Sequence, residues 1–226
     1  SRLTIEQEAI VATNLKAPHW MIVHAFAGSG KTTTLVEYAR RNPHLRFLYL
    51  AFNRAIADEA RSKFPPNTEC KTFHSLAYPL AVWYKRGGKK MHYGDKLRTH
   101  EVAKHVGKSK SDPVLGKALV TLKNFMISAA EEIGVAHVPE QLGRCSASDV
   151  VDCAKLVWDS MKSREADSVP LSHAGYMKMY QLQHPRLDID TSLNRKKLGF
   201  DILLLDEAQD VGPVMFDIVF RQENCA

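Results

Sequence analysis

The chain has 226 residues, of which 45% are hydrophobic and 25% are charged, with a net charge of +6. This composition is typical of a globular protein and excludes collagen-like and low-complexity classes. No apolar stretch reaches the length of a membrane helix and no signal-peptide pattern opens the chain, so we expect no membrane partner.

The positive charge is concentrated in one segment. Residues 85–124 contain eleven Lys or Arg against three Asp or Glu, a surplus larger than the net charge of the whole chain. Such clustering indicates a polyanionic partner such as nucleic acid, although a solvated charged surface would give the same pattern. The four cysteines form no C-x-x-C pair, and we interpret them as free thiols in a reducing compartment.

The first 85 residues alternate between helical and strand patterns. We expect a helix over 5–15, with Thr4 as its N-cap and Gln7 at the capping-box position. The apolar run 20–25 predicts a buried strand, which a glycine-containing loop connects to a helix over about 31–41. Further on we expect strands over 46–52 and 69–73, and helices over 53–63 and 74–85.

The pattern changes after residue 85. Helical patterns recur near 95–106, 113–131, 148–162 and 172–182, followed by a buried strand over 200–206 and a helix over 214–221. We therefore predict an α/β domain with a parallel sheet, formed by residues 1–85 and 193–226, and a mostly helical insertion over 86–192. Parallel sheets of this kind bind ligands beyond the carboxyl ends of their strands.

The run AFAGSGKT at 25–32 has the pattern of a phosphate-binding loop, except that Ala25 stands where the simplest pattern has glycine. Its glycines let backbone N–H groups converge on phosphate oxygens, Lys31 offers a positive charge to the β- and γ-phosphates, and Thr32 offers a hydroxyl to Mg²⁺. The alternative is a Gly-Ser turn that merely precedes a helix. The predicted nucleotide-binding residues here are Ala27, Gly28, Ser29, Gly30, Lys31, Thr32 and Thr33.

The run LLLDEAQD at 203–210 delivers two acids to the end of an apolar strand. Asp206 is the expected Mg²⁺ ligand, and Glu207 is expected to orient and deprotonate the attacking water. Gln209 is placed to sense the γ-phosphate or the moving nucleic-acid strand. The alternative for an acidic strand end is a solvated turn.

Together these motifs resemble superfamily 1 helicases of the UvrD/Rep type, and the runs RFLYLAFNRAIADEA, CKTFHSLAY and FMISAAEEIGVAHVP resemble the F-box DNA helicase branch. The segment 3–7 resembles the Q motif, which implies that Gln7 reads the adenine edge. The segments 50–54 and 70–75 resemble motifs Ia and Ib, which line the single-strand track in that family. The nucleic-acid contacts that we expect are Phe52, Asn53, Thr72, His74, Lys89 and Lys90.

The resemblance implies a RecA-like P-loop fold with a helical 1B insertion, ATP and Mg²⁺ as cofactors, and 3′–5′ movement on single-stranded DNA. It implies single-stranded DNA and its junction with duplex as partners, recombination proteins as further partners, and a monomer in the nucleus or the bacterial cytosol. The residues leave open whether the track is DNA or RNA.

Two alternatives stay open beside a helicase motor. The chain ends sixteen residues after Asp210, and the family continues with a second RecA-like domain that supplies arginines to the γ-phosphate. The sequence thus also fits a binding module without turnover, and we expect the isolated chain to hydrolyse ATP very slowly. The other alternative is a different P-loop NTPase, against which the Q-motif, Ia, Ib and DEAQD segments speak.

Overall fold

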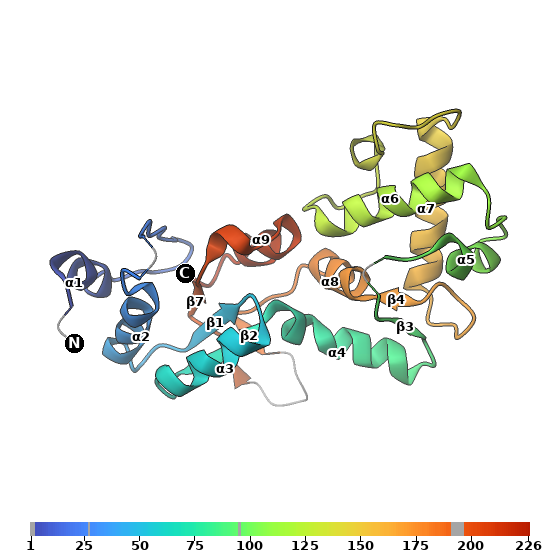
Figure 1. The fold of residues 1–226 in the computed structure, drawn as a ribbon. Coiled ribbons are helices and arrows are strands. Elements are labelled where there is room, and N and C mark those ends of the chain that lie inside the picture. Colours follow the sequence, from blue (N-terminus) through green and yellow to red (C-terminus); the bar gives the residue numbers. More distant parts are fainter. Residues whose placement is uncertain (1–2, 27, 95, 191–196) are drawn as a thin grey trace. The chain divides into compact units, whose positions relative to one another are not determined.

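The computed structural model describes residues 3–26, 28–94, 96–190 and 197–226, and Figure 1 shows their fold. The chain divides into two compact units. Unit 1 comprises residues 1–76, 185–211 and 218–226, and unit 2 comprises 77–184 and 212–217. The units divide at slightly different positions from the predicted domain boundaries of 85/86 and 192/193, which remain a prediction of domain organisation.

Unit 1 is built on a parallel sheet with the strand order β2-β1-β7. The strands are β1 (Phe47–Ala51), β2 (Thr68–Thr72) and β7 (Ile202–Leu205). Because all three run in the same direction, their carboxyl ends meet at one edge. The α/β class with a parallel sheet is therefore confirmed, and the edge predicted to bind ligand exists.

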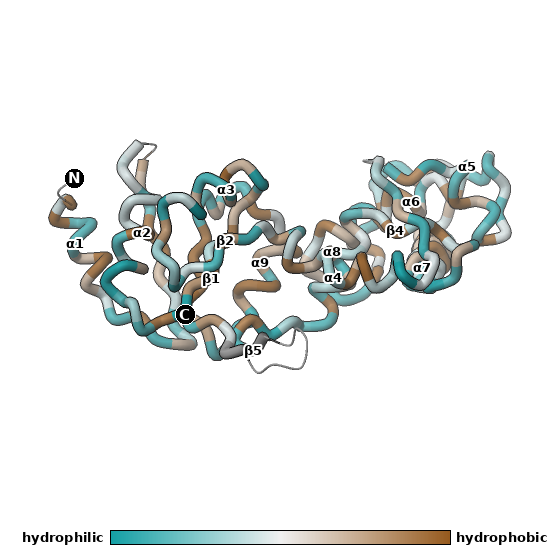
Figure 2. The backbone as a smooth tube through the Cα atoms, turned by 90° about the horizontal axis from the view of Figure 1, so that it is seen from below, coloured by the Kyte–Doolittle hydropathy of each residue, from teal (hydrophilic) through white to brown (hydrophobic). Residues whose placement is uncertain are grey.

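The helices of unit 1 begin close to the predicted positions, and capping side chains fix the starts of two of them. Thr4 and Gln7 form the predicted capping box at the start of α1 (Ile5–Val11), although this helix is shorter than expected. Asn53 caps α3 (Arg54–Lys63) by accepting a hydrogen bond from Ile56 N. The other helices are α2 (Lys31–Arg41), the start of α4 (Phe73–Arg86), the 3₁₀ turn Ala208–Asp210 and the end of α9 (Pro213–Phe220), which is largely apolar (Figure 2).

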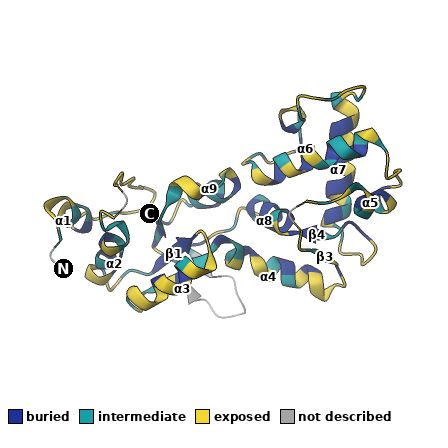
Figure 3. Ribbon diagram, in the orientation of Figure 1, coloured by how far each residue is buried: buried dark blue, intermediate teal, exposed yellow. Residues whose placement is uncertain are grey.

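The core of unit 1 surrounds β1, all five residues of which are buried (Figure 3). Tyr38 of α2 meets Phe47 edge-on with 5.9 Å between ring centroids, and Phe64 lies 4.8 Å from Tyr49. Such a strand, covered on both faces, is typical of parallel sheets and explains its nearly continuous apolar sequence.

The predicted strand over residues 20–25 is wrong. No strand is assigned to the segment, and Trp20 and Ile22 are 62% and 59% exposed. Among the described residues, no backbone hydrogen bond joins this segment to another. The outer side of β7 is instead bonded by Ala226, whose O accepts from Leu203 N and whose N donates to Asp201 O. An apolar run supplies the residue types of a strand, but only a neighbouring edge makes it one.

Unit 2 is mostly helical, as predicted. Its main pair is α6 (Pro113–Ile127) and α7 (Ala147–Lys162), which pack through Phe125 and Trp158 with ring centroids 5.6 Å apart. The sequence did not predict one detail of this unit. The two-residue strands β3 (Met91–His92) and β4 (Leu171–Ser172) pair in parallel.

The remaining elements are short, apart from α8. They are α5 (Thr99–Val102), the 3₁₀ turns Ala103–His105 and Val135–His137, α8 (His173–Leu182), and the antiparallel pair β5 (Ile189–Asp190) and β6 (Lys197–Leu198) in unit 1. Across the described part of the chain, no helix has the length and apolarity to cross a bilayer.

Candidate functional site

The glycine loop before α2 adopts backbone angles that favour glycine. Gly28 has φ +76° and Gly30 has φ +83°, both in the left-handed region. Gly30 is also the N-cap of α2 and contributes no side-chain hydrogen bond, so the first N–H groups of this eleven-residue helix are not capped by a side chain. Uncapped N–H groups and the positive end of the helix dipole suit a phosphate group. The predicted nucleotide ligand Ala27 lies outside the described residues.

Gln7 is fixed beside this loop. Its Oε1 accepts from Thr4 N at 2.9 Å, and its Nε2 donates to Ser29 O at 3.2 Å. A Cβ on Gly30 would lie 2.8 Å from the same Nε2 and would displace the end of the Gln7 side chain, while the positive φ of Gly30 is what favours glycine at this position. Gln7 therefore connects α1 to the glycine loop, and its role in reading adenine stays a prediction.

The two charged motifs meet although they are far apart in sequence. Lys31 Nζ lies 3.4 Å from Glu207 Oε1, and Gln209 Nε2 donates to Glu207 Oε2 at 2.6 Å. These hydrogen bonds, that of Gln209 first and then that of Lys31, hold the pKa of Glu207 below its ordinary value. These contacts favour the ionised form of the Glu207 carboxylate.

Asp206 is held from three sides. Its Oδ2 accepts from Thr32 Oγ1 at 2.7 Å and from Tyr49 OH at 3.1 Å, and its Oδ1 accepts from Glu207 N at 3.0 Å. Glu207 has φ +49°, an uncommon value for a residue other than glycine. The structure therefore brings together Thr32 and Asp206, the two residues predicted to hold Mg²⁺.

These residues fit a magnesium–triphosphate group. Mg²⁺ in nucleotide sites takes one or two protein oxygens and completes its shell with phosphate and water. Thr32 supplies a hydroxyl and Asp206 a carboxylate at the N-terminus of α2, which no side chain caps, and Lys31 lies beside them. Among the described residues, no group of three or more His, Cys, Asp or Glu could hold a metal ion, so the fit is to Mg²⁺ with phosphate rather than to a protein-only metal cage.

Tyr49 is the site residue that the sequence reasoning missed. It lies in β1, is 1% exposed, and burial raises the pKa of its phenol well above the ordinary value, with Asp206 adding to the rise. A signal was present, since a tyrosine inside a fully buried apolar strand needs a partner for its hydroxyl.

The predicted track residues follow the strands at the same edge. Phe52 comes after β1 and is 50% exposed, while Asn53 caps α3. Thr72 ends β2, and its Oγ1 accepts from Ser75 N at 3.1 Å. His74 lies in the first turn of α4 and is partly buried. The exposed ring of Phe52 is compatible with base stacking. Asn53 and Thr72, however, already form hydrogen bonds with the backbone N–H groups of Ile56 and Ser75.

The expectation that Lys89 contacts nucleic acid is wrong, whereas Lys90 is exposed. Lys89 is 3% exposed, and its Nζ donates to Ser160 O at 3.0 Å and to Ser168 Oγ at 2.5 Å. Burial lowers the pKa of Lys89 to about 8. A buried ammonium group requires oxygen acceptors, which Ser160 and Ser168 provide. Lys89 therefore links its own segment of unit 2 to these two serines.

Other basic residues of the segment are paired. Lys104 Nζ lies 3.7 Å from Asp167 Oδ1, and Lys108 Nζ lies 3.5 Å from Asp112 Oδ2. The positive surplus read from the sequence is thus partly balanced by acids from within and beyond the segment.

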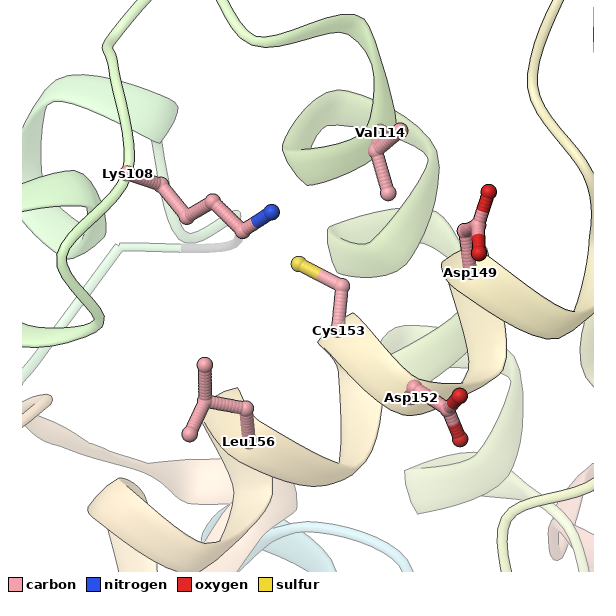
Figure 4. Close-up of a pocket in the computed structure, with 6 residues that line it drawn as sticks. All are labelled: Lys108, Val114, Asp149, Asp152, Cys153 and Leu156. Carbon is pink, nitrogen blue, oxygen red and sulfur yellow. The ribbon is translucent and has the colours of Figure 1, made fainter.

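A hollow of about 490 Å³ lies in unit 2 between α7 and the chain around Lys108. Figure 4 shows the Lys108 side chain reaching toward Cys153, with Asp149 and Asp152 on α7. Burial raises the pKa of the Cys153 thiol, which makes it a poor nucleophile. None of the predicted site residues lines this hollow, whereas Lys31, Thr32, Asp206 and Glu207 all belong to unit 1.

Comparison with protein families matches residues 7–223 to the AAA domain model. The chain belongs to this family. Two relatives cover 98% of the chain: F-box DNA helicase 1 of Gallus gallus is 34% identical over 238 residues, and F-box DNA helicase protein 1 of Schizosaccharomyces pombe is 30% identical over 242 residues.

These matches confirm the relationship to superfamily 1, UvrD-like helicases, and the parallel sheet of unit 1 agrees with a RecA-like P-loop domain. The chain spans 22% of the length of the chicken relative and 26% of the length of the fission yeast relative.

Proposed function

We propose that unit 1 binds Mg²⁺–ATP and serves as the nucleotide-binding part of a DNA helicase motor that moves 3′–5′ on single-stranded DNA. The observation that carries the proposal is the meeting of the glycine loop with the DEAQD motif, through Thr32 with Asp206 and Lys31 with Glu207. Two relatives whose names describe DNA helicases support the nucleic-acid side.

Each residue has a role in the proposed reaction. The N–H groups at the start of α2 and the ammonium of Lys31 bind the β- and γ-phosphate oxygens, while Thr32 and Asp206 hold Mg²⁺. When bound, Mg²⁺ neutralises charge on these oxygens. Glu207 orients the attacking water and accepts its proton, and Gln209, which is bonded to Glu207, is placed to respond to the γ-phosphate.

The nucleic-acid track is proposed at the carboxyl edge of the same sheet. Phe52 would stack on a base, and Asn53, Thr72 and His74 would bind sugar or phosphate. Lys90 would add phosphate contact from the basic segment. The residues after β1 and β2 lie at the same edge of the sheet as Asp206. In this scheme, a structural change at the bound nucleotide can therefore be transmitted to the bound DNA strand and move it.

Nucleotide binding by the 226-residue chain tests the proposal. We expect a fluorescent ATP analogue to bind in the presence of Mg²⁺, and Lys31→Ala to weaken it about thirtyfold, the effect of losing one charged hydrogen bond of about 2 kcal/mol. Lys63→Ala is the matched control, since Lys63 also pairs with a glutamate in unit 1 but lies on α3. Equal binding by all three proteins would contradict the proposal.

A binding module without turnover is the second candidate. The sheet edge and the phosphate loop serve it equally well, so it differs only in hydrolysis. Phosphate release by the whole protein, measured with and without single-stranded DNA, separates the two, because a motor requires DNA-stimulated turnover and a module does not.

A further inference from the structure

The hydroxyl of Tyr49 points from the middle of the sheet to the carboxylate of Asp206. Tyr49 OH donates to Asp206 Oδ2 at 3.1 Å. In the parallel pairing of β1 and β7, Tyr49 is opposite Leu204, two residues before Asp206. Side chains two residues apart on a strand lie on the same face, so this register places the phenol on the side of β7 from which Asp206, the residue after the strand, accepts its hydrogen bond.

The phenol has little freedom to turn elsewhere. Tyr49 is 1% exposed and its ring packs against Phe64, with 4.8 Å between centroids. A buried hydroxyl in such surroundings keeps the partner it has, because an unpaired polar group is costly away from water. The position of Asp206 Oδ2 is therefore coupled to the most buried strand of unit 1.

The other two residues that donate hydrogen bonds to Asp206 also have proposed roles in the reaction itself. Thr32 shares Oδ2 with Tyr49, but its own hydroxyl oxygen is the proposed second protein ligand of Mg²⁺. Glu207 N bonds Oδ1 from the neighbouring residue, which carries the proposed base. Of these three donors, Tyr49 is the one with no other role in the proposed chemistry.

We propose that Tyr49 is a positioning residue for the Mg²⁺ ligand Asp206, holding its carboxylate toward Thr32 from the buried centre of the sheet. This inference rests on the proposed binding of Mg²⁺–ATP. Hydrogen-bond partners that orient metal ligands commonly change metal affinity 10–100-fold when removed. Tyr49→Phe keeps the ring and its packing and removes only the hydroxyl.

Mg²⁺ titrations of nucleotide binding test the role without relying on turnover. We expect Tyr49→Phe to need about tenfold more Mg²⁺ for half-maximal binding of the fluorescent ATP analogue. Binding of the same analogue in EDTA should stay at the wild-type level. Tyr38→Phe is the matched control, since Tyr38 is also buried in unit 1 but donates its hydroxyl to Thr13 O at 3.1 Å.

A second background separates positioning from a general loss of stability. With Asp206→Asn already in place, Tyr49→Phe should cause no further change in the Mg²⁺ midpoint, whereas a merely structural role would add its cost in either background. Wild-type midpoints for Tyr49→Phe, or a further shift in the Asp206→Asn background, would overturn the inference. Wild-type protein that shows no Mg²⁺-dependent binding would instead overturn the proposed function.

Discussion

Lys89 and Lys90 are adjacent in sequence and have opposite environments. Lys89 is buried on oxygen acceptors of Ser160 and Ser168, and Lys90 is exposed. Charge counting along the chain treats the two alike, because it does not show which ammonium groups have protein partners. The structure therefore leaves Lys90, and not Lys89, as the proposed phosphate contact.

Salt-dependent binding of a labelled single-stranded oligonucleotide distinguishes them. Lys90→Ala should weaken binding and reduce the slope of log K against log salt by about 1, since one phosphate contact is lost. Lys89→Met should leave the slope unchanged and lower the melting temperature, because the Ser160 carbonyl and the Ser168 hydroxyl lose their donor. The reverse pattern would contradict the burial of Lys89.

The glycine loop and α2 act as one element at the next scale. Gly30 ends the loop with φ +83° and begins the helix, and a Cβ there would press on Gln7 Nε2. Gly30 thus has a left-handed φ, lies close to Gln7 Nε2 and is the N-cap of α2.

Gly30→Ala should destabilise the chain by about 1–2 kcal/mol, the cost of a left-handed angle for an L-residue, and should also weaken nucleotide binding. Gly116→Ala is an informative control because Gly116 lies in α6, where a Cβ would meet nothing within 4 Å. That change should stabilise the chain by up to about 1 kcal/mol. Denaturant unfolding of the two variants measures both changes in stability, and a Gly30→Ala variant as stable as the wild type would contradict the left-handed conformation of Gly30.

The elements that could be predicted from sequence are those whose signals are local. Helix starts at Thr4 and Asn53 carry their own capping side chains, and the loop before Lys31 carries its glycines. The run 20–25 failed because strand formation depends on a partner edge elsewhere in the chain. Tyr49 was missed for a related reason, since its partner Asp206 is 157 residues away in sequence.

At the scale of the whole molecule, unit 2 interrupts the sequence of unit 1 without separating its site. Thr32 and Asp206 are 174 positions apart, yet their side chains share a hydrogen bond within one compact unit. Parallel strand order explains this, because β7 returns beside β1 after the long excursion and brings its acidic end to the edge beyond which α2 begins. The account therefore requires one metal–nucleotide site composed of two distant motifs.

Electron paramagnetic resonance of bound Mn²⁺ tests that requirement most directly, with Mn²⁺ taking the place of Mg²⁺. In the presence of ATP we expect one Mn²⁺ per chain with magnetic coupling to phosphorus. Thr32→Val and Asp206→Asn should each weaken Mn²⁺ binding, and Asp210→Asn, at an exposed neighbouring acid, should not. Mn²⁺–ATP that binds equally well to the Thr32 and Asp206 variants would contradict the account.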